Sequence, residues 1–345
     1  MSTLTDVARL AGVSTMTVSR VMNDSGHVSA EARARVTGAI AELGYVPNAP
    51  ARQLRSKRTK TLALIVTDIA NPFFTTIARG VEDAARAKGY AVMFCNTDES
   101  EAEEIEYVRM LIGRQVDGVL LVPATDSSAS LQLLRDHRMP VVVLDRRLRQ
   151  GHEDEVRTDS EAGAHLVVRH LLDLGHKRIA ILTGPEAVST SADRVAGYRR
   201  AMAEEGLDLS VEIVVFGEYN EASGYEMTCR VLQSWPRPTA LFAANNFIAF
   251  GAIRALREAG LLTPQDVSVA VFDDLPPGWI FDPFLTVVSQ PAYEIGKQAA
   301  ELMLQRLGGK TPAGPRTIVL PSELIARGST ARASREAAPM FQSQS

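Results

Sequence analysis

The sequence predicts two parts: an all-α N-terminal helix-turn-helix head with a hinge helix, and an α/β body of two doubly wound parallel-sheet subdomains. Three observations carry this prediction. The first 46 residues hold short amphipathic segments separated by caps and glycines. Residues 47–58 form a basic linker whose one large apolar side chain is Leu54. From Thr61 onward, short apolar strands alternate with segments of helical length.

Two short helices around a tight glycine turn are expected at the N-terminus. Thr3 with Asp6 forms a variant of the capping box that starts a helix. Gly12 supplies the left-handed residue that ends it, and Ser14 caps a second helix at once. The apolar side chains of that helix face inward, which leaves outside Thr15, Met16, Ser19 and Arg20. A helix-turn-helix places its second helix in the major groove of DNA, whereas the bland alternative is a generic helical hairpin.

A third helix and a conditional hinge helix complete the predicted head. Ser29 caps the third helix, which runs from about Ala30 to Leu43 and stops at Gly44. In the next segment, 47–58, Asn48 can cap a short helix with Pro50 in its first turn, and the remainder is about two turns long, which is too short to persist alone in water. Leu54 would wedge between base steps in the minor groove while the basic side chains hold phosphates. The alternative is a solvated tether with this leucine folded back.

The charge is distributed unevenly along the 345 residues. Residues 1–60 hold nine Lys or Arg and four Asp or Glu, a net charge of +5. The rest of the chain holds 28 basic and 37 acidic residues, a net charge of −9. A basic head on an acidic body indicates that only the head meets a polyanion.

The sequence indicates a cytoplasmic protein, associated with the nucleoid while it is bound to DNA. Cys95 and Cys229 stand far apart, as is typical of plain core residues in a reducing compartment. Neither a signal segment nor an apolar run of membrane-spanning length is present. The histidine spacings support no metal site, and two acidic runs are predicted to be solvated surface: Asp98–Glu106 and His152-Glu153-Asp154-Glu155.

Nine body strands are predicted: Leu62–Val66, Ala91–Cys95, Val119–Val122, Val141–Leu144, Ile179–Leu182, Ile213–Phe216, Ala240–Ala243, Val269–Phe272 and Thr286–Ser289. Unbroken apolar strands between helices are typical of parallel sheets that are covered on both faces. This many strands fits two doubly wound sheets better than one.

Polar and aromatic residues follow the strands, where open parallel sheets bind their ligands. They comprise Asp68, Asn71, Phe73, Phe74, Asp145, Arg146, Asn245, Asp273 and Gln290, with Arg194 in the first turns after Ile179–Leu182. Singly, each fits a structural role, as a core ring, a helix cap or a surface charge. Together they offer bidentate partners for adjacent hydroxyls and flat rings for a C–H face. Because no phosphate-binding cluster accompanies them, a small polyhydroxylated ligand is expected.

Residues 3–58 resemble the DNA-binding head and hinge of the lac, purine and galactose repressor family. The matching motifs are Asp6-Val7-Ala8, Gly12-Val13-Ser14, Thr17-Val18-Ser19-Arg20-Val21 and Pro47-Asn48 through Leu54. The resemblance implies base-edge contacts by Thr15, Met16 and Arg20, and DNA-backbone contacts by Thr5, Ser14, Asn23 and His27. It also implies that Leu54 and Arg55 enter the minor groove. Met16 departs from the pattern because it cannot hydrogen-bond a base, so it should contact a thymine methyl group or respond to the shape of the DNA. Pro50 replaces an aliphatic residue of paired hinge helices.

The rest of the chain resembles the two-lobed fold that these repressors share with periplasmic sugar-binding proteins. That fold implies three crossings between lobes, near Asp159, Gln290 and Leu320. The corresponding domains are a head at 1–46, a hinge at 47–58 and an effector domain at 59–345. Its N-subdomain would comprise about 60–159 and 291–320, its C-subdomain about 160–289 and 321–330, with a disordered tail at about 331–345. The resemblance implies these sugar contacts: Asn71, Phe73, Phe74, Asp145, Arg146, Arg194, Tyr219, Asn245, Asp273 and Gln290. Val188 stands where purine-responsive members have an Arg, which argues against a nucleobase effector.

The sequence therefore predicts a transcriptional repressor, not an enzyme, that acts as a homodimer on a pseudo-palindromic duplex. It would need no cofactor and would respond to a small sugar, with no membrane partner. One alternative is a sugar-binding protein without a DNA role. Another is a regulator that takes a non-sugar metabolite as corepressor. An enzyme is disfavoured because neither Gly-x-Gly-x-x-Gly after a strand nor Gly-x-Ser-x-Gly is present.

Overall fold

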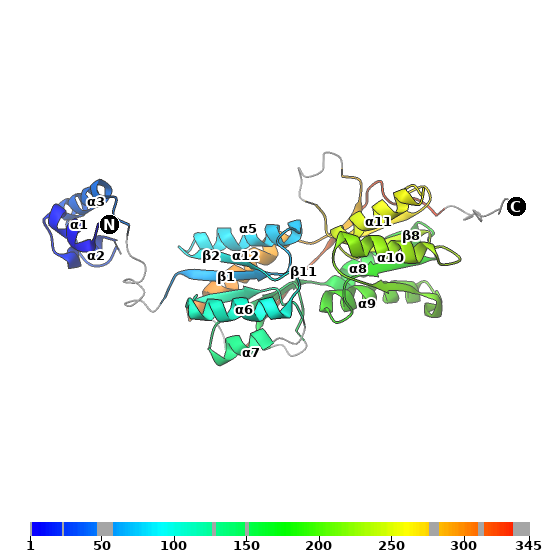
Figure 1. The fold of residues 1–345 in the computed structure, drawn as a ribbon, viewed down its shortest axis with the longest axis horizontal. Coiled ribbons are helices and arrows are strands. Elements are labelled where there is room, and N and C mark those ends of the chain that lie inside the picture. The colour runs from blue at the N-terminus through cyan, green and yellow to red at the C-terminus, as the bar shows by residue number, and fades with distance from the viewer. Residues whose placement is uncertain are drawn as a thin grey trace. The chain divides into compact units, whose positions relative to one another are not determined.

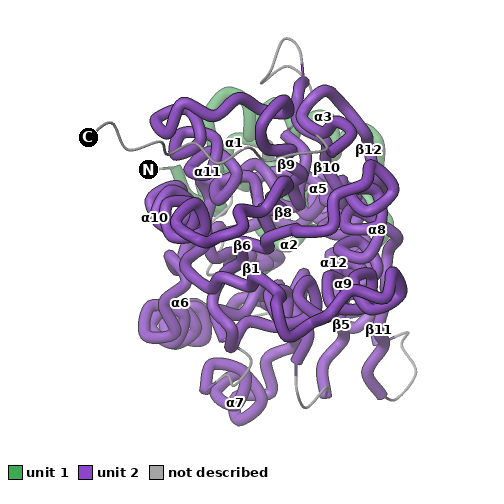
Figure 2. The backbone as a smooth tube through the Cα atoms, turned by 90° about the vertical axis from the view of Figure 1, so that its right-hand side faces the viewer, with its two compact units in different colours: residues 1–59 green, residues 60–345 purple. Residues whose placement is uncertain are grey.

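The computed structural model describes residues 2–22, 24–46, 58–125, 129–148, 152–275, 283–309 and 314–333. The chain divides into two compact units, residues 1–59 and 60–345, which are coloured separately in Figure 2. Four residues with predicted roles lie outside the described residues: Asn23, Pro50, Leu54 and Arg55. So does most of the predicted hinge helix, residues 47–57.

The described residues of the first unit form a head with the helices α1 (Leu4–Ala11), α2 (Thr15–Met22) and α3 (Ala30–Leu43). The capping box is present, because the Asp6 N–H donates to Thr3 Oγ1 at 3.2 Å and the Thr3 N–H donates to Asp6 Oδ2 at 2.9 Å. Gly12, with φ of 64°, ends α1 in the left-handed conformation. A small core closes the head: Val7, Ala8, Ala11, Val18, Val36 and Ala39.

The second unit contains two six-stranded sheets. The first has the order β11-β5-β4-β3-β1-β2 and is parallel throughout. Its strands are β1 (Thr61–Val66), β2 (Ala91–Asn96), β3 (Gly118–Leu121), β4 (Val141–Leu144), β5 (Asp154–Thr158) and β11 (Thr317–Leu320). The second has the order β12-β10-β9-β8-β6-β7 and is parallel except for β12. Its strands are β6 (Ile179–Thr183), β7 (Ile213–Phe216), β8 (Ala240–Ala243), β9 (Ser268–Phe272), β10 (Thr286–Ser289) and β12 (Glu323–Ile325).

Helices cover both faces of each sheet (Figure 1). On the first sheet, α5 (Pro72–Arg86) and α12 (Ala292–Leu307) cover one face, and α6 (Glu101–Gly113) and α7 (Ala129–Asp136) the other. On the second, α8 (Ser160–Asp173) and α9 (Ser189–Glu204) lie opposite α10 (Glu221–Leu232) and α11 (Asn246–Glu258), and a short 3-10 helix, Leu209–Val211, precedes β7. The predicted fold class is confirmed, with two doubly wound lobes built from β-α-β units.

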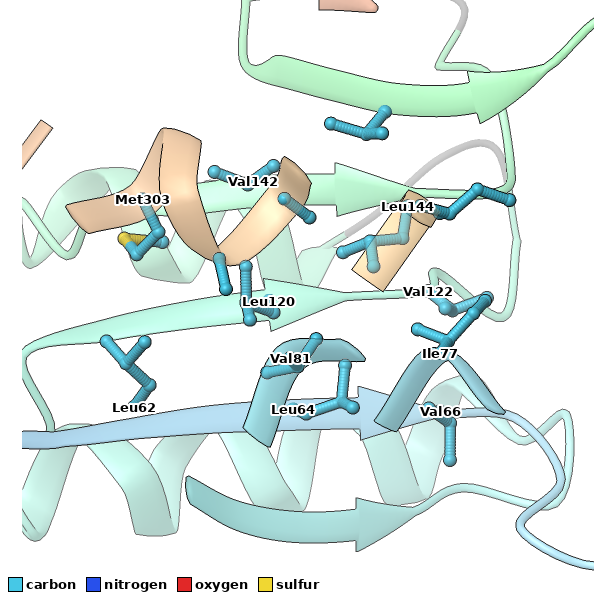
Figure 3. Packing of buried hydrophobic residues seen from close by; sticks show 14 of the residues in the cluster. Leu62, Leu64, Val66, Ile77, Val81, Leu120, Val122, Val142, Leu144 and Met303 are labelled. Atoms are coloured by element: carbon cyan, nitrogen blue, oxygen red, sulfur yellow. The ribbon is translucent and has the colours of Figure 1, made fainter. Parts of the chain in front are cut away.

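Apolar layers between sheet and helices form the cores. Figure 3 shows the layer in which Leu64, Leu120 and Val142 of the strands meet Ile77 of α5 and Met303 of α12. The two helices also touch each other through glycines. A Cβ on Gly80 would lie 2.1 Å from the Tyr293 carbonyl oxygen, and a Cβ on Gly296 would lie 2.0 Å from that of Ile77. This close approach fixes α5, whose first residues reach the end of β1.

The strand orders of the two lobes correspond position by position, so β4 in one lobe is equivalent to β9 in the other. The chain passes to the second sheet after β5, returns after β10, and leaves again between β11 and β12. Each lobe is therefore discontinuous in sequence. Among the helices that the structure describes, none combines the length and apolar character that a bilayer crossing requires.

Three strands were not predicted, and one surface prediction is wrong while another fails at a single residue. β5 and β12 are short and carry charged residues, so no apolar run marks them, whereas β11 contains the apolar residues Ile318 to Leu320 and was missed. The acidic cluster His152–Glu155 is not solvated, because Glu153, Asp154 and Glu155 are buried. In the run Asp98–Glu106, Asp98, Glu103 and Glu106 are exposed as predicted, and only Glu104 is buried, at 1% exposure.

Candidate functional site

The exposed face of α2 carries the side chains that were predicted to meet DNA. Thr15, Met16 and Arg20 are exposed, Met16 by 63%, and Ser19 is half-buried beside them. Thr5 and His27 are exposed on neighbouring segments. Ser14 begins the helix, since its Oγ accepts from the Thr17 N–H at 3.2 Å. The backbone thus presents the first turn of α2 outward, as a helix that enters the major groove requires.

A cavity of about 270 Å³ lies at the carboxyl ends of the strands, between the two lobes. Its wall contains nine of the ten predicted effector residues: Asn71, Phe73, Phe74, Asp145, Arg146, Arg194, Tyr219, Asn245 and Asp273. Thr67, Asp68, Asp98, Glu99, Thr190, Glu218 and Asn220 complete it. Gln290 does not line this cavity. Its Nε2 donates to Asp273 Oδ1 at 2.5 Å, and its Oε1 accepts from Thr158 Oγ1, so it holds Asp273 from behind.

Asp145 and Asp273 occupy equivalent positions in the two lobes, directly after β4 and β9. Both adopt a left-handed backbone, with φ of 64° and 76°. Their N–H groups donate to Val156 and Val288 of the adjacent strands at 3.0 and 2.9 Å. Such backbone is sparsely populated for residues other than glycine, and it gathers at functional sites. Here it turns one carboxylate of each lobe into the cavity.

Burial changes the protonation of these carboxylates. It raises the pKa of Asp145 to about 6, although the guanidinium groups of Arg146 and Arg194 oppose the shift. Burial also raises the pKa of Asp273, against the charge of Arg194 and the hydrogen bond from Gln290. Asp145 Oδ1 is buried without a hydrogen-bond partner. An unpaired buried acceptor of this kind is stabilised by a donor from a ligand.

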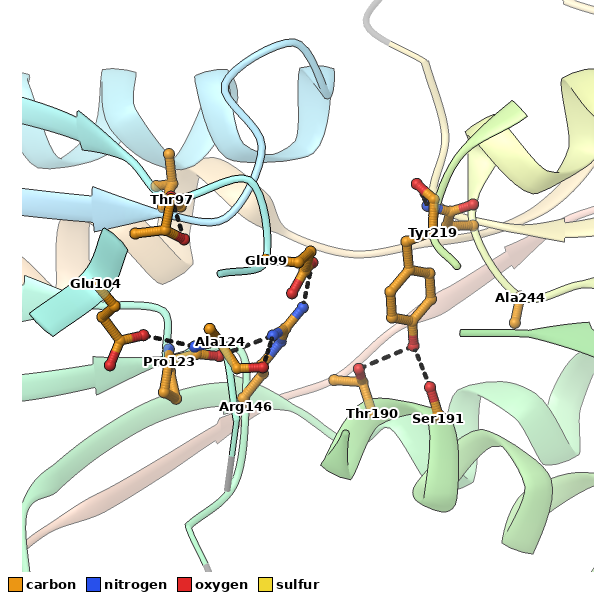
Figure 4. Close-up of polar contacts among 12 residues, drawn as sticks. Thr97, Glu99, Glu104, Pro123, Ala124, Arg146, Thr190, Ser191, Tyr219 and Ala244 are labelled. Carbon is orange, nitrogen blue, oxygen red and sulfur yellow. Dashed lines mark hydrogen bonds and ion pairs between the residues drawn. The ribbon is translucent and has the colours of Figure 1, made fainter. Parts of the chain in front are cut away.

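Two buried guanidiniums stand in the same wall. Arg194 lies over the Phe272 ring, with 3.8 Å between Cζ and the ring centroid, and its Nη1 donates to the Ala244 carbonyl. Arg146 is bound on both sides: Nη2 donates to Glu99 Oε1 at 2.6 Å, and Nη1 donates to the Pro123 and Ala124 carbonyls (Figure 4). Both side chains are thereby held in fixed planes, which suits oriented donation to a small ligand.

Aromatic rings enter the wall from both lobes. Phe73 and Phe74, at the start of α5, form an edge-to-face pair with centroids 5.1 Å apart. Tyr219 of the other lobe bonds through its hydroxyl to Ser191 at 2.7 Å and to Thr190 at 3.2 Å (Figure 4). Its ring lies against Gly184, where an added Cβ would be 2.3 Å from Tyr219 Cε2. The rings can cover the apolar face of a ligand.

Polar contacts join the lobes across the cavity. Asn246 Nδ2 donates to Asn71 Oδ1 at 3.2 Å, and the Arg147 N–H donates to Ser189 Oγ at 2.9 Å. Arg147 also forms an ion pair with Asp193. A ligand between the lobes would therefore act on an interface that already contains hydrogen bonds.

The comparisons with known proteins agree with this arrangement. Residues 3–48 match the model of "Bacterial regulatory proteins, lacI family", and residues 59–328 match that of "Periplasmic binding proteins and sugar binding domain of LacI family". The chain belongs to the LacI family. It is 36% identical over 312 residues to the transcriptional repressor PurR of Aliivibrio salmonicida, which covers 90% of this chain and 93% of that one.

Solved structures of LacI-family regulators superpose on this chain. The lac repressor dimer bound to operator and the anti-inducer ONPF matches with a TM-score of 0.84 and 29% identity, covering 96% of this chain and 99% of that one. A complex of the regulator CelR with cellobiose matches with a TM-score of 0.74 and 34% identity, covering 95% of this chain and 100% of that one. A LacI-family regulator from Enterococcus faecium with bound ribose matches with a TM-score of 0.72 and 32% identity, covering 79% of this chain and 100% of that one. The chain is a DNA-binding transcriptional repressor and not an enzyme.

Sequence reasoning missed several wall residues of this LacI-family cavity. Glu99 and Asp98 follow β2 in a turn with positive φ values of 60° and 48°, so they reach the cavity although they lie within an acidic run. Thr190 stands in the first turn of α9. The rule that ligand groups follow strand ends applies to β2 as well, and it would have indicated the first two. In the described part of the chain, no group of three or more His, Cys, Asp or Glu is arranged to hold a metal ion.

Proposed function

We propose that the operator affinity of this repressor is controlled by a small neutral sugar that binds between the two lobes. The observation that carries the proposal is the composition of the cavity wall. Paired acceptors and fixed donors from both lobes stand beside aromatic rings, in a volume of about 270 Å³. That volume lies just below the ~300–1,000 Å³ of sites for drug-sized ligands, as a monosaccharide requires.

The charge of the wall restricts the effector further. Six carboxylates, Asp68, Asp98, Glu99, Asp145, Glu218 and Asp273, face two guanidiniums, Arg146 and Arg194. An anionic ligand would add its charge to this surplus, and such repulsion costs free energy in a partly buried site. A neutral polyol instead donates hydroxyl protons to the carboxylates and accepts from the guanidiniums. Phosphorylated sugars are therefore expected to bind more weakly than the free sugars.

The regulatory mechanism follows from the position of the cavity. A ligand that contacts both lobes favours the closed arrangement over the open one, because its contacts are complete only when the lobes meet. We propose that the repressor acts as a homodimer and that closure weakens its hold on a pseudo-palindromic operator. A coupling of roughly 1–3 kcal/mol would change operator affinity about 5–150-fold.

A purine-type corepressor is the second candidate, and the match to repressors named PurR favours it. Phe73, Phe74 and Tyr219 could stack on a purine as well as on a sugar ring. The Val188 position argues for the sugar, since the family resemblance implies an arginine there in purine-responsive members.

A thermal-shift screen of the full chain separates the candidates. Its arms are D-ribose, D-glucose, D-galactose and cellobiose against hypoxanthine and guanine, because a ligand of the native state raises the melting temperature. Ribose 5-phosphate tests the exclusion of anions. We expect a shift with at least one free sugar and a smaller one with the phosphate. A shift with the purines alone would overturn the sugar proposal. Operator duplexes selected from a random library then report whether the bound compound weakens or strengthens DNA binding.

A further inference from the structure

Glu104 is a buried carboxylate on a helix whose other acidic residues are more exposed. It stands in the first turns of α6, after the Ser100 cap, and is only 1% exposed, whereas Glu103 and Glu106 are exposed. Burial raises the pKa of Glu104, and the hydrogen bonds from Ser130 and Ala124 oppose that shift. A carboxylate removed from water in this way is retained only where specific donors compensate its lost hydration.

Both oxygens of this carboxylate have donors, and neither donor belongs to the cavity wall. Oε2 accepts from the Ala124 N–H at 2.6 Å, and Oε1 accepts from Ser130 Oγ. The helix N-terminus adds a favourable field for the charge. Glu104 thus holds the segment that follows β3 against the start of α6 (Figure 4).

The peptide group that Glu104 binds is also the one that Arg146 binds. The Ala124 N–H and the Pro123 carbonyl belong to the same peptide unit, and Arg146 Nη1 donates to that carbonyl at 2.8 Å. One amide therefore lies between an anion at its N–H end and a cation at its C=O end. Each partner polarises the amide in the direction that strengthens the other hydrogen bond.

We infer that Glu104 is a positioning residue for the effector cavity, acting on the Arg146 guanidinium through the Pro123–Ala124 peptide. The inference rests on the proposed function, because Arg146 is taken to donate to the effector. Glu104 itself does not line the cavity. Its effect is to fix the peptide on which Arg146 rests, while Glu99 fixes the other edge of the guanidinium at 2.6 Å.

The test uses Glu104→Gln, which keeps the shape and can still accept from Ala124 and donate to Ser130, but carries no charge. Glu106→Gln, an exposed residue of the same helix, is the matched control. Affinity is measured by calorimetry on the full chain, with D-ribose or whichever of the four sugars binds most tightly. We expect a loss of about 3–10-fold for Glu104→Gln, since the charge-assisted bond becomes a neutral one, and no change for Glu106→Gln.

A double-mutant cycle distinguishes positioning from a general structural role. Arg146→Lys keeps the positive charge but cannot bond the peptide and Glu99 in one plane. We expect Glu104→Gln to lower sugar affinity less than 2-fold in the Arg146→Lys background. An equal loss in both backgrounds would overturn the inference, because Glu104 would then act without Arg146.

The same cycle by urea unfolding of the empty protein needs no ligand. If none of the four sugars binds, the proposed sugar effector is wrong, and the unfolding cycle decides the inference alone. Coupling between the two substitutions supports the amide linkage, and additive effects refute it.

Discussion

Asp145 links the stability of the empty protein to pH. Its pKa is raised to about 6 by burial, so between pH 3.8 and 6 the folded protein holds a proton that the unfolded chain has lost. Stability from this group is therefore present at low pH and is lost as the pH rises through 6. Asp145→Asn is expected to raise the urea midpoint at pH 7.5, by a margin that shrinks toward pH 4. A constant margin across this range would contradict the assignment.

The ionised form of the same residue is expected to matter for the effector. At pH 7.5 the ionised Asp145 carboxylate is expected to accept a ligand hydroxyl, whereas below pH 6 it is protonated and is a weaker acceptor. Sugar affinity should fall between pH 7.5 and 5.5 in the native protein and vary less in Asp145→Asn. Burial raises the pKa of Asp273 and Asp68 also, which leaves a residual slope in the variant. Calorimetric titration at several pH values measures both slopes.

A substitution of Arg194 tests the contribution of the second lobe to the cavity. It is 4% exposed, held by the Phe272 ring and the Ala244 carbonyl. Arg194→Ala is expected to reduce sugar affinity by about 2–4 kcal/mol, in the range of buried hot-spot residues, and to spare operator binding. Arg200→Ala, on the exposed side of the same helix, is the control. Fluorescence anisotropy of a labelled operator, recorded with increasing sugar concentration, measures operator binding and the response to sugar. An unchanged sugar response in Arg194→Ala would remove this residue from the site.

At the scale of the elements, two helical glycines should respond oppositely to alanine. Gly80 of α5 has no room for a Cβ, because the Tyr293 carbonyl oxygen would be 2.1 Å away. Gly38, inside α3, has nothing within 4 Å of that position. Gly80→Ala is expected to destabilise the body by about 1–3 kcal/mol through overpacking. Gly38→Ala should stabilise the head by about 0.5–1 kcal/mol, since glycine is costly in a helix.

Scanning calorimetry of the full chain checks this pair. If both substitutions moved the unfolding transitions in the same direction, the close approach of α5 and α12 would not be the cause.

The elements that could be predicted are those whose own residues are apolar enough to indicate burial. β1, with the burial of five consecutive apolar side chains, is such a case. β5 could not be predicted, because the buried Asp154 carboxylate is paired with the Arg306 side chain and the Arg316 N–H, which lie 152 and 162 residues away. The same holds for Glu104, whose donors follow β3. A local pattern does not contain partners that the fold supplies from a distance.

The cavity was more predictable than these contacts, for a geometrical reason. The carboxyl ends of parallel strands converge on one edge, so residues such as Asn245 and Asp273 can be assigned to a site from strand positions alone. Strand positions do not indicate which side chains hold the wall residues in place from outside the cavity. Gln290 was placed in the wall, whereas it holds Asp273 by a hydrogen bond of 2.5 Å.

At the scale of the whole molecule, the uneven charge predicts how DNA binding responds to truncation. Residues 1–60 carry nine basic and four acidic residues, and the rest of the chain is acidic. Removing residues 1–58 is therefore expected to abolish retention on DNA-cellulose, while the sugar-induced thermal shift persists. For the intact chain, the logarithm of affinity should fall linearly with the logarithm of salt concentration, by about 0.9 for each neutralised phosphate. Equal retention of the truncated chain would locate DNA binding elsewhere.

The placement of β11 and β12 has a consequence for how the protein is made. These two strands, at 317–320 and 323–325, complete the edges of different sheets. Neither lobe is whole until the ribosome has released almost the entire polypeptide, whereas the three helices of the head are available from the start of translation. A late nonsense codon would thus leave the head intact, while each lobe lacks an edge strand of its sheet.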